Sequence, residues 1–133
     1  MEKEVKPMEK QWQEASQNAH TENPTRKLDK NTITLYLIDQ NLSPQYKGFI
    51  FLRDVLLHTT QDASGLSSMT AVYNAVAREN STTYECVKHN IRYLMEMWCA
   101  QKDHPHWKRP QNKRVISLLT LHLLMGNEGP IEL

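Results

Sequence analysis

The sequence predicts an all-α fold: a small multi-helix bundle that contains a helix-turn-helix. The 133 residues include only four glycines, too few for the tight turns of a β-sandwich or barrel. Apolar side chains instead recur at helical spacing through several consecutive segments. Hydrophobic residues make up 39% of the chain and charged residues 23%, which suits one modest core and argues against wholesale disorder. No stretch approaches 18 consecutive apolar residues, so no transmembrane helix is expected.

The chain divides into three parts. Residues 1–28 form a polar N-terminal tail in which a short helix near 8–18 would end before Asn23-Pro24. Residues 29–126 form the helical domain, and residues 127–133 form a C-terminal tail. The first residues lack the apolar core of a secretory signal, and Cys86 and Cys99 are too few for a disulfide framework. We therefore expect a cytoplasmic protein.

The first half of the domain predicts two helices. In segment 31–41 the β-branched residues favour a strand by propensity, but no partner strand follows, so a helix is the better interpretation. Ser43-Pro44 supplies an N-cap and a first-turn proline for a second helix that runs to about Thr59. The broad apolar face of this helix is typical of a central core helix. Residues 61–67, which include Gly65, are expected to form a loop.

The next two helices are separated by a short turn. Ser68 is a candidate cap for a helix whose buried stripe is Met69, Val72, Tyr73 and Val76. This helix should end near Asn80, because asparagine tolerates the left-handed conformation common at helix ends. Thr82-Thr-Tyr-Glu85 then matches a capping box, with Thr82 as the N-cap and Glu85 at the third position.

The helix predicted over residues 83–98 buries Val87, Ile91, Leu94 and Trp98 on one face. Together with the preceding helix it has the outline of a helix-turn-helix, whose second helix enters the DNA major groove. Residues 103–111 read as a loop, and Asn112 is a candidate cap for a last helix over 113–125. This last helix is apolar around almost its whole circumference, so burial in the core or at a subunit interface is expected.

Positive charge is concentrated in one third of the chain. The formal net charge is +1, but residues 68–114 hold eight basic side chains against four acidic ones. Such clustering is the footprint of a polyanionic partner such as DNA, although a solvated face of a neutral protein remains open on charge alone. The candidate DNA-binding residues are Thr82, Thr83, Glu85, Cys86, Lys88, His89, Arg92, Tyr93, Lys108 and Arg109.

These candidates have different expected roles. His89 and Arg92 are placed to reach base edges or phosphates from the free face of the helix. Lys88, Lys108 and Arg109, with Lys113 and Arg114, are expected to contact phosphates, which position the protein without specifying sequence. Thr82 and Thr83 stand at a helix N-terminus, where hydroxyl and backbone N–H groups suit a phosphate as well as a plain cap.

Metal and catalytic chemistry find little support. Cys86 and Cys99 would lie about 20 Å apart on one helix, too far to share a zinc ion, while Cys99 with His104 and His106 remains open. There is no glycine-rich phosphate loop, zinc-protease motif or serine-hydrolase elbow. We expect neither an enzyme nor a bound cofactor.

Residues 44–98 resemble the C-terminal DNA-binding effector domain of the stage-zero sporulation transcription factor, a bacterial response regulator. The resemblance rests first on Lys47-Gly-Phe-Ile-Phe-Leu-Arg53, Met69-Thr-Ala-Val72 and Ser81-Thr-Thr83. Ile91-Arg92 and Arg109-Pro110-Gln-Asn112 extend it, so that it covers roughly residues 31–125. It implies an all-α domain that binds short DNA boxes, often as tandem protomers, and touches RNA polymerase to regulate sporulation genes.

The sequence departs from that family in two places. The family places a phospho-accepting receiver domain before the effector, whereas here a polar tail stands in that position. The family's recognition helix runs Arg-Val-Glu-Arg-Ala-Ile-Arg-His, and the same stretch here is Cys86-Val-Lys-His-Asn-Ile-Arg-Tyr93. The two buried residues are the same in both. Of the exposed residues only Arg92 is kept. A protein-interaction module with weak DNA binding, which pairs with a full-length relative or RNA polymerase, is therefore the alternative function.

Overall fold

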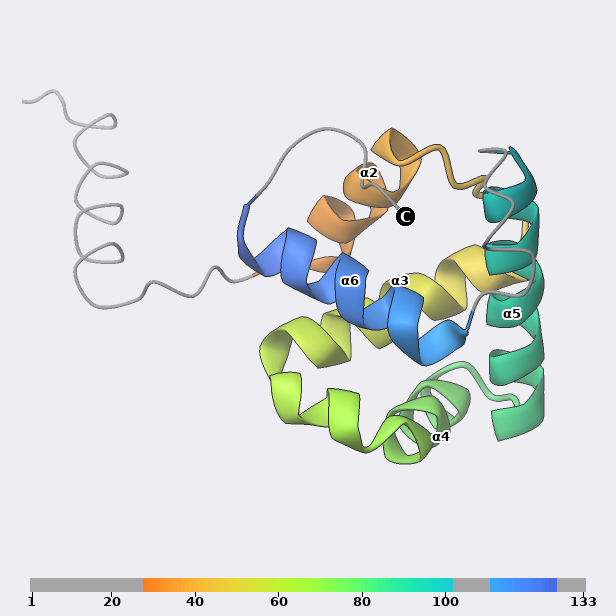
Figure 1. The fold of residues 1–133 in the computed structure, drawn as a ribbon. Helices are drawn as coiled ribbons and strands as arrows, with labels where there is room; N and C mark the ends of the chain where they lie inside the picture. The colour runs from red at the N-terminus through yellow and green to blue at the C-terminus, as the bar shows by residue number, and fades with distance from the viewer. Residues whose placement is uncertain (1–27, 102–110, 127–133) are drawn as a thin grey trace, which may run out of the picture.

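The computed structural model describes residues 28–101 and 111–126. Within these ranges every regular element is helical, which confirms the all-α prediction. The α3 helix lies at the centre, with α2, α4, α5 and α6 packed around it (Figure 1). In chain order the elements are α2 (Lys30–Asp39), α3 (Lys47–Gln61), the 3-10 helix η1 (Ala63–Ser67), α4 (Met69–Glu79), α5 (Tyr84–Gln101) and α6 (Asn112–Leu124).

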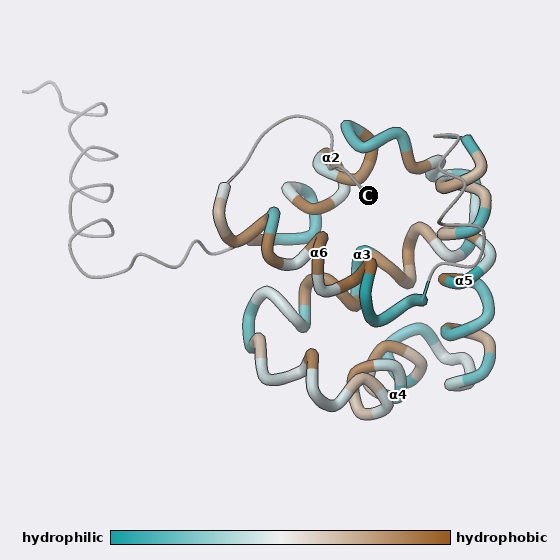
Figure 2. The backbone as a smooth tube through the Cα atoms, in the orientation of Figure 1, coloured by the Kyte–Doolittle hydropathy of each residue, from teal (hydrophilic) through white to brown (hydrophobic). Residues whose placement is uncertain are grey.

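One hydrophobic core joins these helices. The predicted stripe of α5, Val87, Ile91, Leu94 and Trp98, is buried throughout, and so are Val72, Tyr73 and Val76 of α4. Hydrophobic and hydrophilic residues alternate along α5, as an amphipathic helix requires (Figure 2). Leu28, which the sequence places in the tail, is also buried and belongs to the same core. The helical domain therefore includes this residue.

The α3 helix begins later than the sequence predicts. Ser43 and Pro44 lie in a turn, and the N-cap residue is Tyr46, whose backbone is extended and whose side chain makes no capping hydrogen bond. The Tyr46 ring meets the Tyr93 ring of α5 edge-on, with 5.7 Å between their centroids. This tertiary contact outweighs the local preference of Ser-Pro for a helix start. The helix also continues to Gln61, two residues beyond the expected end.

Segment 61–67, expected to be a loop, is largely helical. Asp62 ends α3 in an extended conformation, and residues 63–67 then form η1. The Asp62 carboxylate accepts hydrogen bonds from the Ser64 backbone N–H at 3.1 Å and from the Ser64 hydroxyl at 2.7 Å. Asp62 thus caps η1 through a local side-chain to backbone hydrogen bond.

The left-handed residue after α4 is Ser81 and not Asn80. Ser81 has φ 54°, whereas Asn80 has φ −109°. The Thr82 N–H donates to Ala77 O at 2.8 Å and the Ser81 N–H to Arg78 O at 3.3 Å, which is the hydrogen-bond pattern of a Schellman motif. The Asn80 amide instead donates hydrogen bonds to the Asp54 carboxylate and to Val76 O, which tie this residue to α3 and to its own helix.

The α6 helix is buried on one side and open on the other. Val115, Ile116, Leu119 and Leu123 are in the core, but Leu121 is 53% exposed and Met125 is 68% exposed. The expectation of burial around most of the circumference therefore holds only in part for the described residues. No helix in the described part of the chain is long and apolar enough to cross a membrane.

Candidate nucleic-acid interface

A threonine caps the start of α5, but the capping residue is Thr83 and not Thr82. The Thr83 hydroxyl accepts the Cys86 N–H at 3.1 Å, and the Thr83 carbonyl accepts the Val87 N–H, so Thr83 is the N-cap. Glu85 then stands at the second helical position and not the third, so the predicted capping box does not form in this register. The reason is that the Thr82 N–H already closes the end of α4 through Ala77 O.

The N-terminal half of α5 presents an exposed polar face. Glu85, His89 and Arg92 are exposed, as is Tyr93 at the edge of this face, while Val87 and Ile91 are buried behind it. The His89 Nε2 lies 3.8 Å from the Glu85 carboxylate across one turn of the helix. Because both side chains are largely exposed, this contact leaves them free to exchange partners. The face accordingly offers side chains of both charge types to a ligand.

Two further candidates lie at the margins of this face. Lys88 is half-buried, and its ammonium lies 5.7 Å from the centre of the Tyr84 ring. Cys86 is half-buried against the core, and the Asn90 amide donates to its carbonyl at 2.8 Å and to its sulfur at 3.4 Å. Both of these contacts to Cys86 come from its own helix.

Gly48 lies where α3 and α5 approach each other closely. A Cβ atom at this position would collide with the Asn90 carbonyl oxygen of α5 and lie 2.8 Å from the carbonyl carbon. Residue 48 must therefore lack a side chain for the start of α3 to pack against the middle of α5. This packing braces the exposed face of α5 from behind.

A buried carboxylate that the sequence does not reveal holds the turn between α4 and α5. Asp54 of α3 is 3% exposed and accepts hydrogen bonds from the Asn80 amide at 3.0 Å and from the Arg53 Nε at 2.9 Å. The His58 Nε2 of α3 lies 2.8 Å from the Glu79 carboxylate at the end of α4. The only sequence signal for this anchor is a charged Arg-Asp pair in the middle of an apolar helix.

The start of α6 lies beside α5. The Asn112 amide, predicted to cap its own helix, instead donates to the Lys88 carbonyl at 3.2 Å, and the N-cap residue Gln111 makes no side-chain cap. Lys113 and Arg114 are exposed in the following positions. This first turn of α6 contains no acidic residue, so positive charge is gathered next to Lys88. The other two predicted cations, Lys108 and Arg109, lie outside the described residues.

The described residues contain no group of three side chains that could hold a metal ion. Cys99 is buried and Cys86 half-buried, thirteen positions apart on the same helix. The histidines of the remaining zinc hypothesis, His104 and His106, lie outside the described residues.

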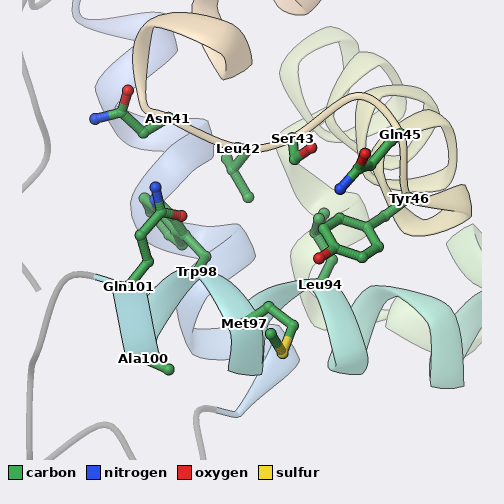
Figure 3. Close-up of a pocket in the computed structure, with 10 residues that line it drawn as sticks. All are labelled: Asn41, Leu42, Ser43, Gln45, Tyr46, Leu94, Met97, Trp98, Ala100 and Gln101. Atoms are coloured by element: carbon green, nitrogen blue, oxygen red, sulfur yellow. The ribbon is translucent and has the colours of Figure 1, made fainter.

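A groove lies beyond the polar face, between the α2–α3 connection and the C-terminal half of α5 (Figure 3). Its apolar lining comes from Leu42, Tyr46, Leu94, Met97 and Trp98, and the other lining residues that the structure describes carry no charge. None of the predicted DNA-contacting residues that the structure describes lines it. The groove and the polar face are therefore separate features of α5.

A small all-α domain with an exposed polar helix and basic side chains beside it is typical of proteins that bind DNA. Residues 33–123 match the family described as the sporulation initiation factor Spo0A C-terminal domain, so this chain belongs to that family. The family is one of DNA-binding domains of a transcription regulator of sporulation and not a family of enzymes. A search of the curated proteins found no match.

Proposed function

We propose that the chain binds double-stranded DNA sequence-specifically in the bacterial cytoplasm and thereby regulates transcription. In this proposal α4, residues 80–83 and α5 act as a helix-turn-helix, and α5 is the helix that enters the major groove. The regulated genes are sporulation genes or genes under related control, as family membership suggests.

The observation that carries the proposal is the exposed face of Glu85, His89 and Arg92 on a helix whose opposite face is buried. An arginine guanidinium matches the O6 and N7 acceptors of guanine with two donors. A glutamate can accept from the amino group of cytosine, and the His89 imidazole can serve as a donor or an acceptor. These three side chains are therefore the proposed base-reading set.

Other residues are proposed to grip the DNA backbone. Thr82 and Thr83 directly precede the first residue of α5, and the N-terminal end of a helix attracts phosphates. Lys88 and Lys113 lie on adjoining parts of α5 and α6, and Arg114, Lys108 and Arg109 add to the same basic stretch of sequence. Tyr93 and the partly buried Cys86 are proposed as contacts at the edge of the interface.

A protein-binding role is the second candidate function. Leu121 of α6 and Met125, which directly follows α6, are large apolar side chains more than half exposed, as expected of a surface that meets a second protomer or RNA polymerase. In that case DNA binding would be weak and salt-sensitive, and a stable protein complex would carry the function.

Selection of bound duplexes from a random library at two salt concentrations tests the proposal. A DNA-specific regulator enriches a defined box, and the enriched box survives the higher salt better than random duplexes do. Binding without enrichment, lost as salt rises, would instead show that only phosphate contacts are present and would favour the protein-binding role.

A further inference from the structure

The side chain of Asn112 makes an unusual contact for the first residue of a helix. Its amide does not cap α6 but donates across to the Lys88 carbonyl of α5, at 3.2 Å. Lys88 lies within α5, so in regular helix geometry its carbonyl also accepts the backbone N–H four residues later. A carbonyl can take two hydrogen bonds, and the second one here comes from another helix. The Lys88 carbonyl would therefore have a partner without Asn112, and the contact serves to link α5 to α6.

The same amide also faces α4. The Asn112 Oδ1 atom is enclosed, and no described residue donates a hydrogen bond of good geometry to it. Burial raises the pKa of the Tyr73 hydroxyl of α4, and the Asn112 side chain opposes that rise in part. Asn112 thus stands where α4, α5 and α6 meet.

The position of this junction along α5 gives it a role in recognition. Lys88 precedes His89 directly and lies one turn before Arg92, the two side chains proposed to reach the bases. Side chains of a helix end about 6 Å from its axis, so a rotation of about 10° moves them by about 1 Å. Functional groups must be held within about 0.5 Å to work as a set. A contact that fixes the rotation of α5 at Lys88 is therefore a contact that sets base reading.

We propose that Asn112 is a positioning residue for DNA recognition, which fixes the rotation of α5 through the hydrogen bond to the Lys88 carbonyl. This inference rests on the proposed function, in which α5 reads the DNA sequence. Asn112 itself touches no base in this account. It acts on specificity only through the orientation of Lys88, His89 and Arg92.

The test compares Asn112→Leu with Asn74→Leu as a matched control. The Asn74 amide donates to Thr70 O within its own helix α4 and links no two helices. For each protein we would measure affinity for the library-selected duplex and for a scrambled duplex, at a temperature well below its melting point. Asn112→Ser serves as a second variant should the leucine disturb folding, because its shorter side chain cannot span to the Lys88 carbonyl.

The expected result is that Asn112→Leu and Asn112→Ser bind the selected duplex at least tenfold more weakly while binding the scrambled duplex as wild type does. Asn74→Leu should keep the wild-type ratio. A merely structural role would lower the melting temperature without changing this ratio in folded protein. If both Asn112 variants keep the wild-type ratio of affinities for the two duplexes, the inference is overturned while the proposed function stands. A wild-type protein that does not discriminate the two duplexes would overturn the proposed function and the inference with it.

Discussion

The carboxylate of Asp54, buried in the central helix α3, accepts a hydrogen bond of 3.0 Å from the amide of Asn80, the residue that ends α4 before the turn into α5. The same Asn80 amide donates to Val76 O at 2.9 Å. One side chain therefore links the last turn of α4 to the residue that follows it and to the central helix α3. The turn that leads from α4 into α5 is therefore tied to the central helix through a buried carboxylate.

Removal of this anchor should destabilise the fold. We expect Asp54→Ala to lower the free energy of unfolding by about 2 kcal/mol, because hydrogen bonds to charged groups contribute about 1.5–3 kcal/mol. Asn80→Ala should cost about 1 kcal/mol, since Arg53 still pairs with the carboxylate. Urea unfolding of the two single variants and the double variant measures both values and their coupling. Strict additivity of the two changes would contradict a direct bond between the residues.

Gly48→Ala should destabilise the protein, although alanine is the better helix former. In an exposed helix interior this change would gain up to about 1 kcal/mol, but here the new Cβ collides with the Asn90 carbonyl. We expect a net loss of about 1–3 kcal/mol, the usual cost of overpacking. Gly65→Ala is the control, because its nearest neighbour would be the Val72 side chain, at 3.1 Å, and not a backbone. Equal melting temperatures for the two variants would show that α3 and α5 are not in this close contact.

The register of the turn can be tested at the two threonines. Loss of an N-cap hydroxyl costs about 1 kcal/mol, so Thr83→Ala should lower stability by about that amount, whereas Thr83→Ser should keep most of it. Thr82→Ala should have a smaller effect, because its backbone N–H and not its hydroxyl closes α4. Thermal unfolding of the three variants measures the difference. If Thr82→Ala were instead the more destabilising change, Thr82 would be the N-cap, as the capping box predicted from the sequence requires.

Acid should weaken the fold through two helix-capping aspartates. The Thr32 backbone N–H lowers the pKa of Asp29, and the Ser64 hydroxyl lowers the pKa of Asp62, each from an ordinary value of 3.8. A carboxyl whose pKa is lower in the folded state stabilises the fold above its unfolded pKa, and this contribution is lost as the pH falls through the folded value. We therefore expect stability to fall below about pH 4.

Replacement of both aspartates by asparagine isolates this effect, since asparagine also caps helices but does not titrate. The double variant Asp29→Asn, Asp62→Asn should show a shallower loss of stability between about pH 5 and about pH 2.5 in urea unfolding than wild type does. Parallel curves for the two proteins would place the acid sensitivity elsewhere in the molecule.

Patterns that repeat along a helix could be predicted from the sequence. The buried stripes of α4 and α5 follow the helical period. Hydrophobic burial requires this period, and the exact position of each helix end does not change it. The close approach at Gly48 was also predictable, because a glycine inside a helix is costly unless another backbone needs the space. The all-α class followed from the same periodicity.

Helix ends and cross-links depended on contacts that local sequence does not contain. Ser43-Pro44 has the form of a helix start, yet the packing of Tyr46 against Tyr93 moves that start to Lys47. Thr82 has the form of a cap, yet its N–H is used by α4. Asn112 has the form of a cap as well, and its amide reaches a different helix. In each case a partner outside the local segment competes with a local hydrogen bond.

The most direct test of sequence-specific recognition by α5 is the affinity of Arg92→Lys for the library-selected duplex and for a scrambled one. Lysine keeps the positive charge but loses the paired donors that match guanine. If Arg92 reads a base, the variant should bind the selected duplex about 5- to 150-fold more weakly, equivalent to about 1–3 kcal/mol, and the scrambled duplex with unchanged affinity and salt dependence. Equal affinity of wild type and variant for the selected duplex would contradict the assignment of this face of α5 as the base-reading surface.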